Sequence, residues 1–252
     1  LSEIDRRVEE FIPAAQALLS KKTNSAVVFA QKKLNAVWDI IFTMPVYRDL
    51  NMVLELSYHL LERLYEQKEK WEQVQEVHSE GREMYERMIN DLAHFADRVR
   101  ALRLQLRIMT EKYFEPLKRR NSEAYGTAYA SFYADMLRTG ALFFDEDFDQ
   151  RFSVEIDFVP MMRKETEGEC FVAEKTTFNY LHDFLRTEFY RGLAIGNAPR
   201  RCHNCGKYFL LTDGYNTCYC GNIAPGETER TCRKVGAHRK EAQGKANRSP
   251  AR

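Results

Sequence analysis

Five of the six cysteines of this chain lie between Cys202 and Cys232, and the sixth is Cys170. Such clustering in a chain without an export signal favours metal binding over disulfides. The segment that begins at Cys202 reads Cys-His-Asn-Cys-Gly-Lys-Tyr-Phe, which is typical of a zinc knuckle. Two residues between Cys202 and Cys205 let both thiolates reach one ion, and Gly206 can adopt the positive φ with which the chain leaves the turn.

A closed metal site needs two further ligands, and the candidates are Cys218, Cys220, Cys232, His203 and His238. We select Cys220 and Cys232, because Thr231 is a typical helix N-cap. It would place Cys232 in the first helical turn, where the helix dipole favours a thiolate. The predicted site is one Zn²⁺ held by Cys202, Cys205, Cys220 and Cys232, with Cys218 or His238 as open alternatives. Four sulfurs leave no position for substrate, so the site is structural, and so small a module would need it to fold.

The charge of the chain is unevenly distributed, although its net charge is only +1. Residues 200–252 carry eleven basic and four acidic side chains, a net of +7, which leaves −6 for residues 1–199. A basic end on an acidic body favours an anionic partner such as nucleic acid. The candidate contacts are Arg201, Lys207, Arg233, Lys234, Arg239 and Lys240. The alternative is that these cations only offset the net negative charge of a zinc ion with four thiolates.

No catalytic constellation is evident in the rest of the sequence. A di-metal centre in a helical bundle needs Glu-x-x-His on two helices, and the nearest pattern is a single Asp91-x-x-His94. The sequence motifs of zinc proteases, phosphate-binding loops and serine hydrolases do not occur. Cys170 falls in a predicted strand, where we expect it to be buried rather than nucleophilic. We therefore expect a protein that is not an enzyme.

The elements that must position the cysteines are mostly helical. Apolar residues recur at three- and four-residue steps over 1–20, 26–42 and 49–113, which predicts amphipathic helices. Gly81 beside Ser79 should divide the third run into two long helices that pack antiparallel, as in a bundle. A further helix is predicted over 122–137.

A small β-hairpin is predicted before the cysteine segment. Residues 153–159 alternate apolar and polar side chains, and 170–174 can form the partner strand. Thr176 or Thr177 should then cap a helix that reaches Leu193. The predicted fold class is mainly α, with a small C-terminal zinc module made of knuckle, hairpin and short helix. The predicted parts are a bundle-like helical body over 1–150, the hairpin and joining helix over 151–199, the zinc module over 200–240 and a disordered basic tail over 241–252.

The composition is that of an ordinary globular protein. Hydrophobic residues make up 44% and charged residues 30%, which argues against collagen-like, mucin-like or wholly disordered chains. No apolar run approaches the roughly 18 residues of a membrane helix. The first residues, Leu-Ser-Glu-Ile-Asp, lack the basic and apolar regions of an export signal. We expect a cytoplasmic protein without membrane contact.

The C-terminal segment resembles a family of uncharacterised bacterial proteins with a zinc-ribbon-like module of four cysteines. The matching residues are Gly192-Leu193, Gly196-Asn197-Ala198-Pro199, the knuckle, Tyr219-Cys220, Ala224-Pro225-Gly226-Glu227 and Thr231-Cys232-Arg233. This resemblance implies zinc binding and favours Cys220 over Cys218. A looser similarity, in Cys220-Gly221-Asn222, is to the CGNR zinc-finger proteins, with Ile223 where that signature has arginine. It implies a bacterial transcriptional regulator that binds DNA.

Two functions are compatible with these features. The first is a non-enzymatic, nucleic-acid-binding regulator that contacts phosphates through the basic zinc module. The alternative is a protein-interaction adaptor in which the zinc module is a structural cap or a docking surface. In either case the helical body offers a surface for a protein partner or for a second copy of the chain.

Overall fold

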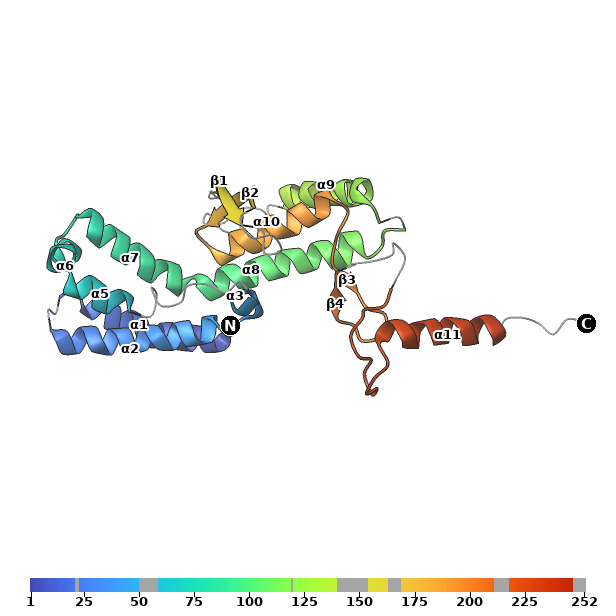
Figure 1. Ribbon diagram of the computed structural model, residues 1–252, viewed down its shortest axis with the longest axis horizontal. Helices are drawn as coiled ribbons and strands as arrows, with labels where there is room; N and C mark the ends of the chain where they lie inside the picture. The colour runs from blue at the N-terminus through green and yellow to red at the C-terminus, as the bar shows by residue number, and fades with distance from the viewer. Residues whose placement is uncertain are drawn as a thin grey trace, which may run out of the picture. The chain divides into compact units, whose positions relative to one another are not determined.

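The computed structural model describes residues 1–20, 23–49, 59–118, 120–139, 154–162, 169–210 and 218–246. Within these residues the chain is mainly helical and carries two small antiparallel hairpins, as predicted (Figure 1). It forms two compact units, Leu1–Ala101 and Leu102–Arg252. The division between the units falls inside a helix. The predicted boundary at residue 150 lies outside the described residues.

The first unit is a set of helices around one apolar core. Its elements are α1 (Ser2–Ala17), α2 (Asn24–Ile41), α3 (Pro45–Asp49), α5 (Leu60–Glu66), α6 (Lys68–Gln75) and α7 (Glu80–Ala93). Residues three and four apart in α1, namely Val8, Phe11 and Ala15, are buried in the same core as Leu34 and Val37 of α2. These two helices confirm the predictions for 1–20 and 26–42.

The run over 49–113 does not form two long helices divided at Gly81. Among the described residues it is split into α5, α6, α7, α8 (Phe95–Ile108) and a π-helix, η1 (Met109–Phe114). The break before α7 lies at Ser79, whose hydroxyl accepts the N–H of Arg82 at 3.0 Å and so caps the helix. Gly81 is inside α7, where a Cβ atom would lie 2.8 Å from the Cβ of Gln73. The glycine therefore permits close packing of the chain instead of ending a helix.

The second unit packs η1 against α9 (Ser122–Thr139), and α9 lies beside α10 (Leu181–Ala194) (Figure 1). Its core is aromatic. The Phe114 ring stands edge-on to Tyr125 with the ring centroids 5.2 Å apart, and Phe132 and Leu193 are buried in the same cluster. Ala198 also belongs to this cluster, so the chain is anchored to the core just before the cysteine segment. α9 confirms the predicted helix over 122–137.

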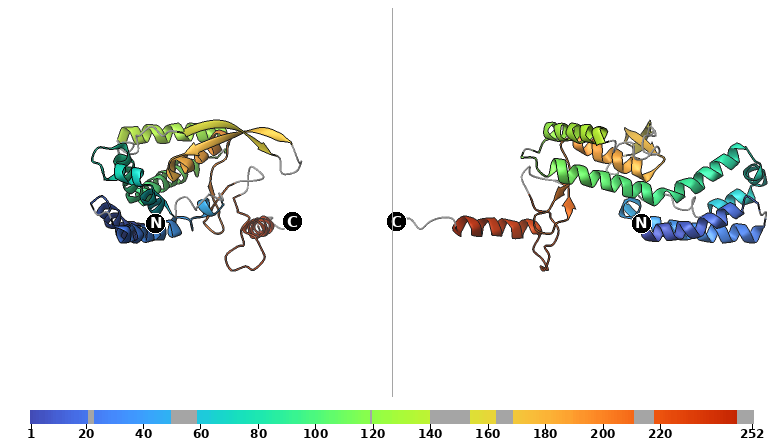
Figure 2. Two further views of the ribbon diagram at one scale, coloured as in Figure 1. Left: turned by 60° about the vertical axis from the view of Figure 1, so that its left-hand side comes forward. Right: turned by 180° about the vertical axis from the view of Figure 1, so that it is seen from behind.

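The predicted hairpin is present and longer than expected. β1 (Val154–Met162) pairs antiparallel with β2 (Cys170–Phe178) in a twisted ribbon (Figure 2). Thr176 and Thr177 lie in β2 rather than at a helix N-terminus, because they continue the ladder opposite β1; α10 begins after Tyr180. The expectation that Cys170 is buried is wrong, since it is exposed at the start of β2. The ribbon also exposes several large apolar side chains, namely Ile156, Phe158, Met161, Met162, Phe171 and Val172.

The cysteine module begins with a second hairpin, β3 (Arg200–Arg201) and β4 (Tyr208–Phe209), and ends with α11 (Cys232–Ala246). α11 continues past Lys240, so residues 241–246 are helical and the prediction of a disordered tail is wrong for them. Residues 247–252 of that predicted tail lie outside the described residues. No helix in the described part of the chain is both long and apolar enough to cross a membrane.

Candidate metal centre

The first half of the site is the tight turn between β3 and β4. The N–H of Cys202 donates to the carbonyl of Lys207 at 2.9 Å, and the N–H of Gly206 donates to the carbonyl of Cys202 at 2.8 Å. Gly206 has a φ of 71°, which confirms the predicted left-handed conformation at this position. These bonds bring Cys202 and Cys205 to one side of the turn, which is the local geometry of a zinc knuckle.

The second half of the site joins the segment after Cys220 to the start of α11. The N–H of Cys232 donates to the carbonyl of Asn222 at 2.8 Å, and the N–H of Arg233 donates to the carbonyl of Cys220 at 3.1 Å. The Thr231 hydroxyl accepts the N–H of Lys234 at 3.3 Å, so Thr231 is the predicted N-cap and Cys232 is the first residue of the helix. Backbone hydrogen bonds thus hold the segment of Cys220 and Asn222 against the start of α11, where Cys232 lies.

The four sulfur atoms converge on one point. The Sγ atoms of Cys202, Cys205, Cys220 and Cys232 all lie within 4.8 Å of one another, and those of Cys205 and Cys220 are 3.6 Å apart. Sulfurs around a tetrahedral Zn²⁺ are about 3.8 Å apart, given a Zn–S bond of about 2.3 Å. Cys205 is half-buried and the other three are buried. The group can therefore hold a metal ion, and its donor set of four soft thiolates suits zinc or iron.

The surroundings shift the pKa values of three of the thiols, and not all in the same direction. Burial alone raises the pKa of the Cys202 thiol, but N–H groups of Cys220, Cys205 and Asn204 outweigh it and lower that pKa to about 6. Burial raises the pKa of the Cys220 thiol to about 12, and it also raises the pKa of Cys232. Because neighbouring thiolates repel one another, ionising all four together requires a bound cation.

The alternative ligands lie outside the four-sulfur group. Cys218 is half-buried, and its carbonyl accepts the N–H of His203 at 2.9 Å. The His203 side chain is exposed and stands edge-on to the Tyr219 ring, with the centroids 6.1 Å apart. His238 is exposed on α11. Among the described residues, the structure therefore assembles the four cysteines that the sequence analysis selected and neither Cys218 nor His238.

The basic residues around the centre are mostly exposed. Five of the six predicted contacts have exposed side chains and no ion pair with a carboxylate in the described part of the chain, namely Arg201, Lys207, Arg233, Lys234 and Arg239. The sixth, Lys240, lies within α11. Arg200 differs from its neighbours because it is only 6% exposed.

One contact that supports the centre was missed from the sequence. The Tyr219 ring lies against the backbone of α11, and a Cβ atom at Gly236 would come within 2.5 Å of two ring carbons. A glycine inside a helix is less stable than an alanine there. The position of Gly236 in a helical segment was therefore the sequence signal that another side chain packs closely against the helix. The glycine therefore lets Tyr219, the residue before Cys220, pack on the helix that begins with Cys232.

The Gly236→Ala variant should therefore weaken the module. The new methyl group must displace Tyr219, and overpacking of this kind typically costs about 1–3 kcal/mol. We expect faster loss of metal to a chelator and a lower unfolding midpoint of the module. Gly221→Ala is the matched control, because a Cβ atom there meets nothing within 4 Å. Equal behaviour of the two variants would contradict the assigned role of the Tyr219 contact.

The C-terminal part of the chain is similar to a protein family whose function is unknown. Residues 149–252 match the model of a family of unknown function (DUF6076). The matched range includes the β1–β2 ribbon, α10 and all four clustered cysteines. No curated protein and no solved structure matches the chain.

Proposed function

We propose that the C-terminal module is a structural zinc site whose helix α11 binds nucleic acid, and that the protein is not an enzyme. The observation that carries this proposal is the convergence of four thiols at the start of a helix whose exposed cations Arg233, Lys234 and Arg239 form no ion pair within the described residues. Zn²⁺ with four thiolates is closed to substrate, so the ion stabilises the module and does no chemistry on a ligand.

Zinc is favoured over other metals by the geometry of the module. The four cysteines come from a knuckle and a helix start, and each half is a compact turn that suits a single ion with tetrahedral ligands. The buried cluster around the sulfurs contains one aliphatic side chain besides them, Ala224. So small an apolar core needs a metal to hold it together.

The exposure of the basic side chains favours nucleic acid as the partner. If they served only to neutralise the metal centre, some should lie packed against it. The side chains of Arg233 and Lys234 are instead exposed on the first turn of α11. The segment Cys220-Gly221-Asn222 is loosely similar to the CGNR zinc-finger proteins. This similarity supports a bacterial DNA-binding regulator that acts in the cytoplasm.

The test is the salt dependence of binding to a short DNA duplex. We expect the affinity of the zinc-loaded chain to fall steeply between roughly 50 and 200 mM salt. Arg233→Gln/Lys234→Gln should weaken binding and reduce the slope of log K against log salt by about 2, or about 1 for each lost phosphate contact. Fluorescence anisotropy of labelled DNA measures both quantities.

A matched control removes the same charge elsewhere. Lys68 and Lys70 are exposed in α6 of the first unit, so Lys68→Gln/Lys70→Gln should leave the slope unchanged. Absence of DNA binding at low salt, or an unchanged slope in the α11 variant, would reject the nucleic-acid proposal. The protein-interaction adaptor would then be the remaining candidate.

A further inference from the structure

A side-chain hydrogen bond joins the two halves of the metal centre. Asn204 is one of the two residues between Cys202 and Cys205, and its Nδ2 atom lies 3.4 Å from the Sγ atom of Cys232 at the start of α11. Sulfur is a larger acceptor than oxygen, so this is a hydrogen-bonding distance. The amide presents its NH₂ group to the sulfur, because a carbonyl oxygen would be repelled by a thiolate. The contact links residues 28 positions apart in the chain.

Two other sulfurs of the group receive hydrogen bonds from the backbone. The N–H of Cys220 donates to the Sγ atom of Cys202 at 3.4 Å, and the N–H of Asn222 donates to the sulfur of Cys220. Every residue except proline supplies such a donor, so these contacts tolerate a change of side chain. The donor to Cys232 belongs to a side chain instead, and it is lost when a residue without an N–H group stands at position 204.

The Cys232 sulfur needs a donor from the protein, because water cannot supply one. Cys232 is 0% exposed. A buried thiolate without a hydrogen bond is costly, and a metal ion held by four thiolates keeps a net negative charge that nearby N–H groups offset. Donors of this kind also fix the orientation of a metal ligand, and their removal typically lowers metal affinity by about 10–100-fold.

We propose that Asn204 is a positioning residue of the metal centre, whose carboxamide holds the Cys232 thiolate and ties the start of α11 to the knuckle. The hydrogen bond keeps the Cys232 sulfur in the group of four that converge on one point. Without it, Cys232 can move away with the first turn of α11, and the metal is bound less tightly. The proposal rests on the metal-binding part of the proposed function and not on nucleic-acid binding.

The test measures the metal affinity of the full chain in competition with a chelator of known affinity, for Zn²⁺ and for Co²⁺ as a coloured substitute. Asn204→Leu keeps the approximate size of the side chain and removes the donor. We expect it to weaken the binding of both ions by about 10–100-fold. Asn204→Asp places a negatively charged acceptor against the thiolate, so it should weaken binding at least as much.

A spectroscopic readout separates positioning from a general structural role. A hydrogen bond draws electron density from the sulfur, so its loss should move the thiolate-to-Co²⁺ charge-transfer band of Asn204→Leu to longer wavelength. A variant that only loosens the fold would lower the occupancy without shifting the band. Asn204→Gln keeps the amide on a longer side chain and should recover part of both the affinity and the band position.

Asn222→Leu is the matched control. It removes an exposed carboxamide two residues after Cys220 but keeps the backbone N–H that donates to that cysteine, so affinity and band should be unchanged. An affinity of Asn204→Leu within roughly threefold of the unaltered chain, an unshifted band, or an equal loss in Asn222→Leu would overturn the proposal.

The same measurements distinguish this proposal from the metal site itself. If the unaltered chain binds neither ion, the metal site and the role of Asn204 fail together. If it binds both ions and Asn204→Leu binds them as tightly, the role of Asn204 fails alone. Duplex DNA enters neither comparison, so the proposal for α11 is judged separately by its salt dependence.

Discussion

Replacing both Cys202 and Cys205 with serine should abolish metal binding and unfold the C-terminal module. The two residues supply half of the four-sulfur group, and the remaining pair cannot close a tetrahedral site. Binding of structural zinc to small modules contributes about 10–16 kcal/mol in apparent free energy, far more than the few apolar contacts around the sulfurs can replace. We expect metal content to fall from about one ion per chain to none, and the amide resonances of the module to collapse to unfolded positions.

Cys218→Ser is the matched control for this experiment. Cys218 lies between the two halves of the site in sequence but outside the four-sulfur group, so its replacement should leave metal content and module structure unchanged. Elemental analysis of the purified variants measures the metal. Loss of metal from Cys218→Ser together with its retention in Cys220→Ser would show that the ligand set is wrong.

The second large effect is expected in the first unit. The Phe11 side chain is 0% exposed at the centre of the α1–α2 packing, and truncation to alanine leaves a cavity in that core. Such changes cost about 3–5 kcal/mol. We expect Phe11→Ala to lower the urea midpoint of helix unfolding strongly, as followed by circular dichroism. Metal content should be unchanged, since all four cysteines belong to the second unit.

Phe29→Ala provides the comparison within the same pair of helices. The Phe29 side chain is 55% exposed on α2, so its removal deletes the same atoms without creating a cavity. Its effect should stay within about 0.5 kcal/mol. A similar loss of stability in both variants would mean that the core of the first unit is not centred on Phe11.

The group of four cysteines could be predicted from sequence because most of its determinants are local. The two-residue spacing of Cys202 and Cys205, the glycine that follows them and the N-cap Thr231 each act over a few residues. The amphipathic helices α1 and α2 were predictable for the same reason, since their periodicity alone reports which face is buried. The choice of Cys220 over Cys218 also followed from spacing and resemblance.

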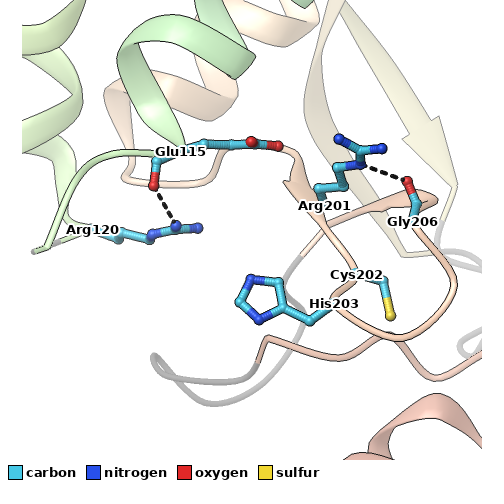
Figure 3. A pocket seen from close by; sticks show the side chains of 6 residues that line it. All are labelled: Glu115, Arg120, Arg201, Cys202, His203 and Gly206. Carbon is cyan, nitrogen blue, oxygen red and sulfur yellow. Dashed lines mark hydrogen bonds between the residues drawn. The ribbon is translucent and has the colours of Figure 1, made fainter.

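The features that were missed depend on contacts between segments distant in sequence. Glycine is common at helix ends, but Gly81 lies inside α7 and makes room for Gln73 of the preceding helix. Threonine is common at helix N-caps, but Thr176 and Thr177 pair with β1 and therefore lie in a strand. A pocket of the second unit is lined by Glu115 and Arg120 together with knuckle residues (Figure 3). The two segments lie far apart along the chain, so no local pattern could indicate it.

The burial of the sulfurs determines how quickly the bound ion can exchange with solvent. Cys202, Cys220 and Cys232 are at most 1% exposed, and only Cys205 offers an outward path. A chelator can therefore approach a bound ion in the closed state only past Cys205, and wider access requires the knuckle or the first turn of α11 to open. The part of the metal-release rate that does not depend on chelator concentration then measures that opening motion.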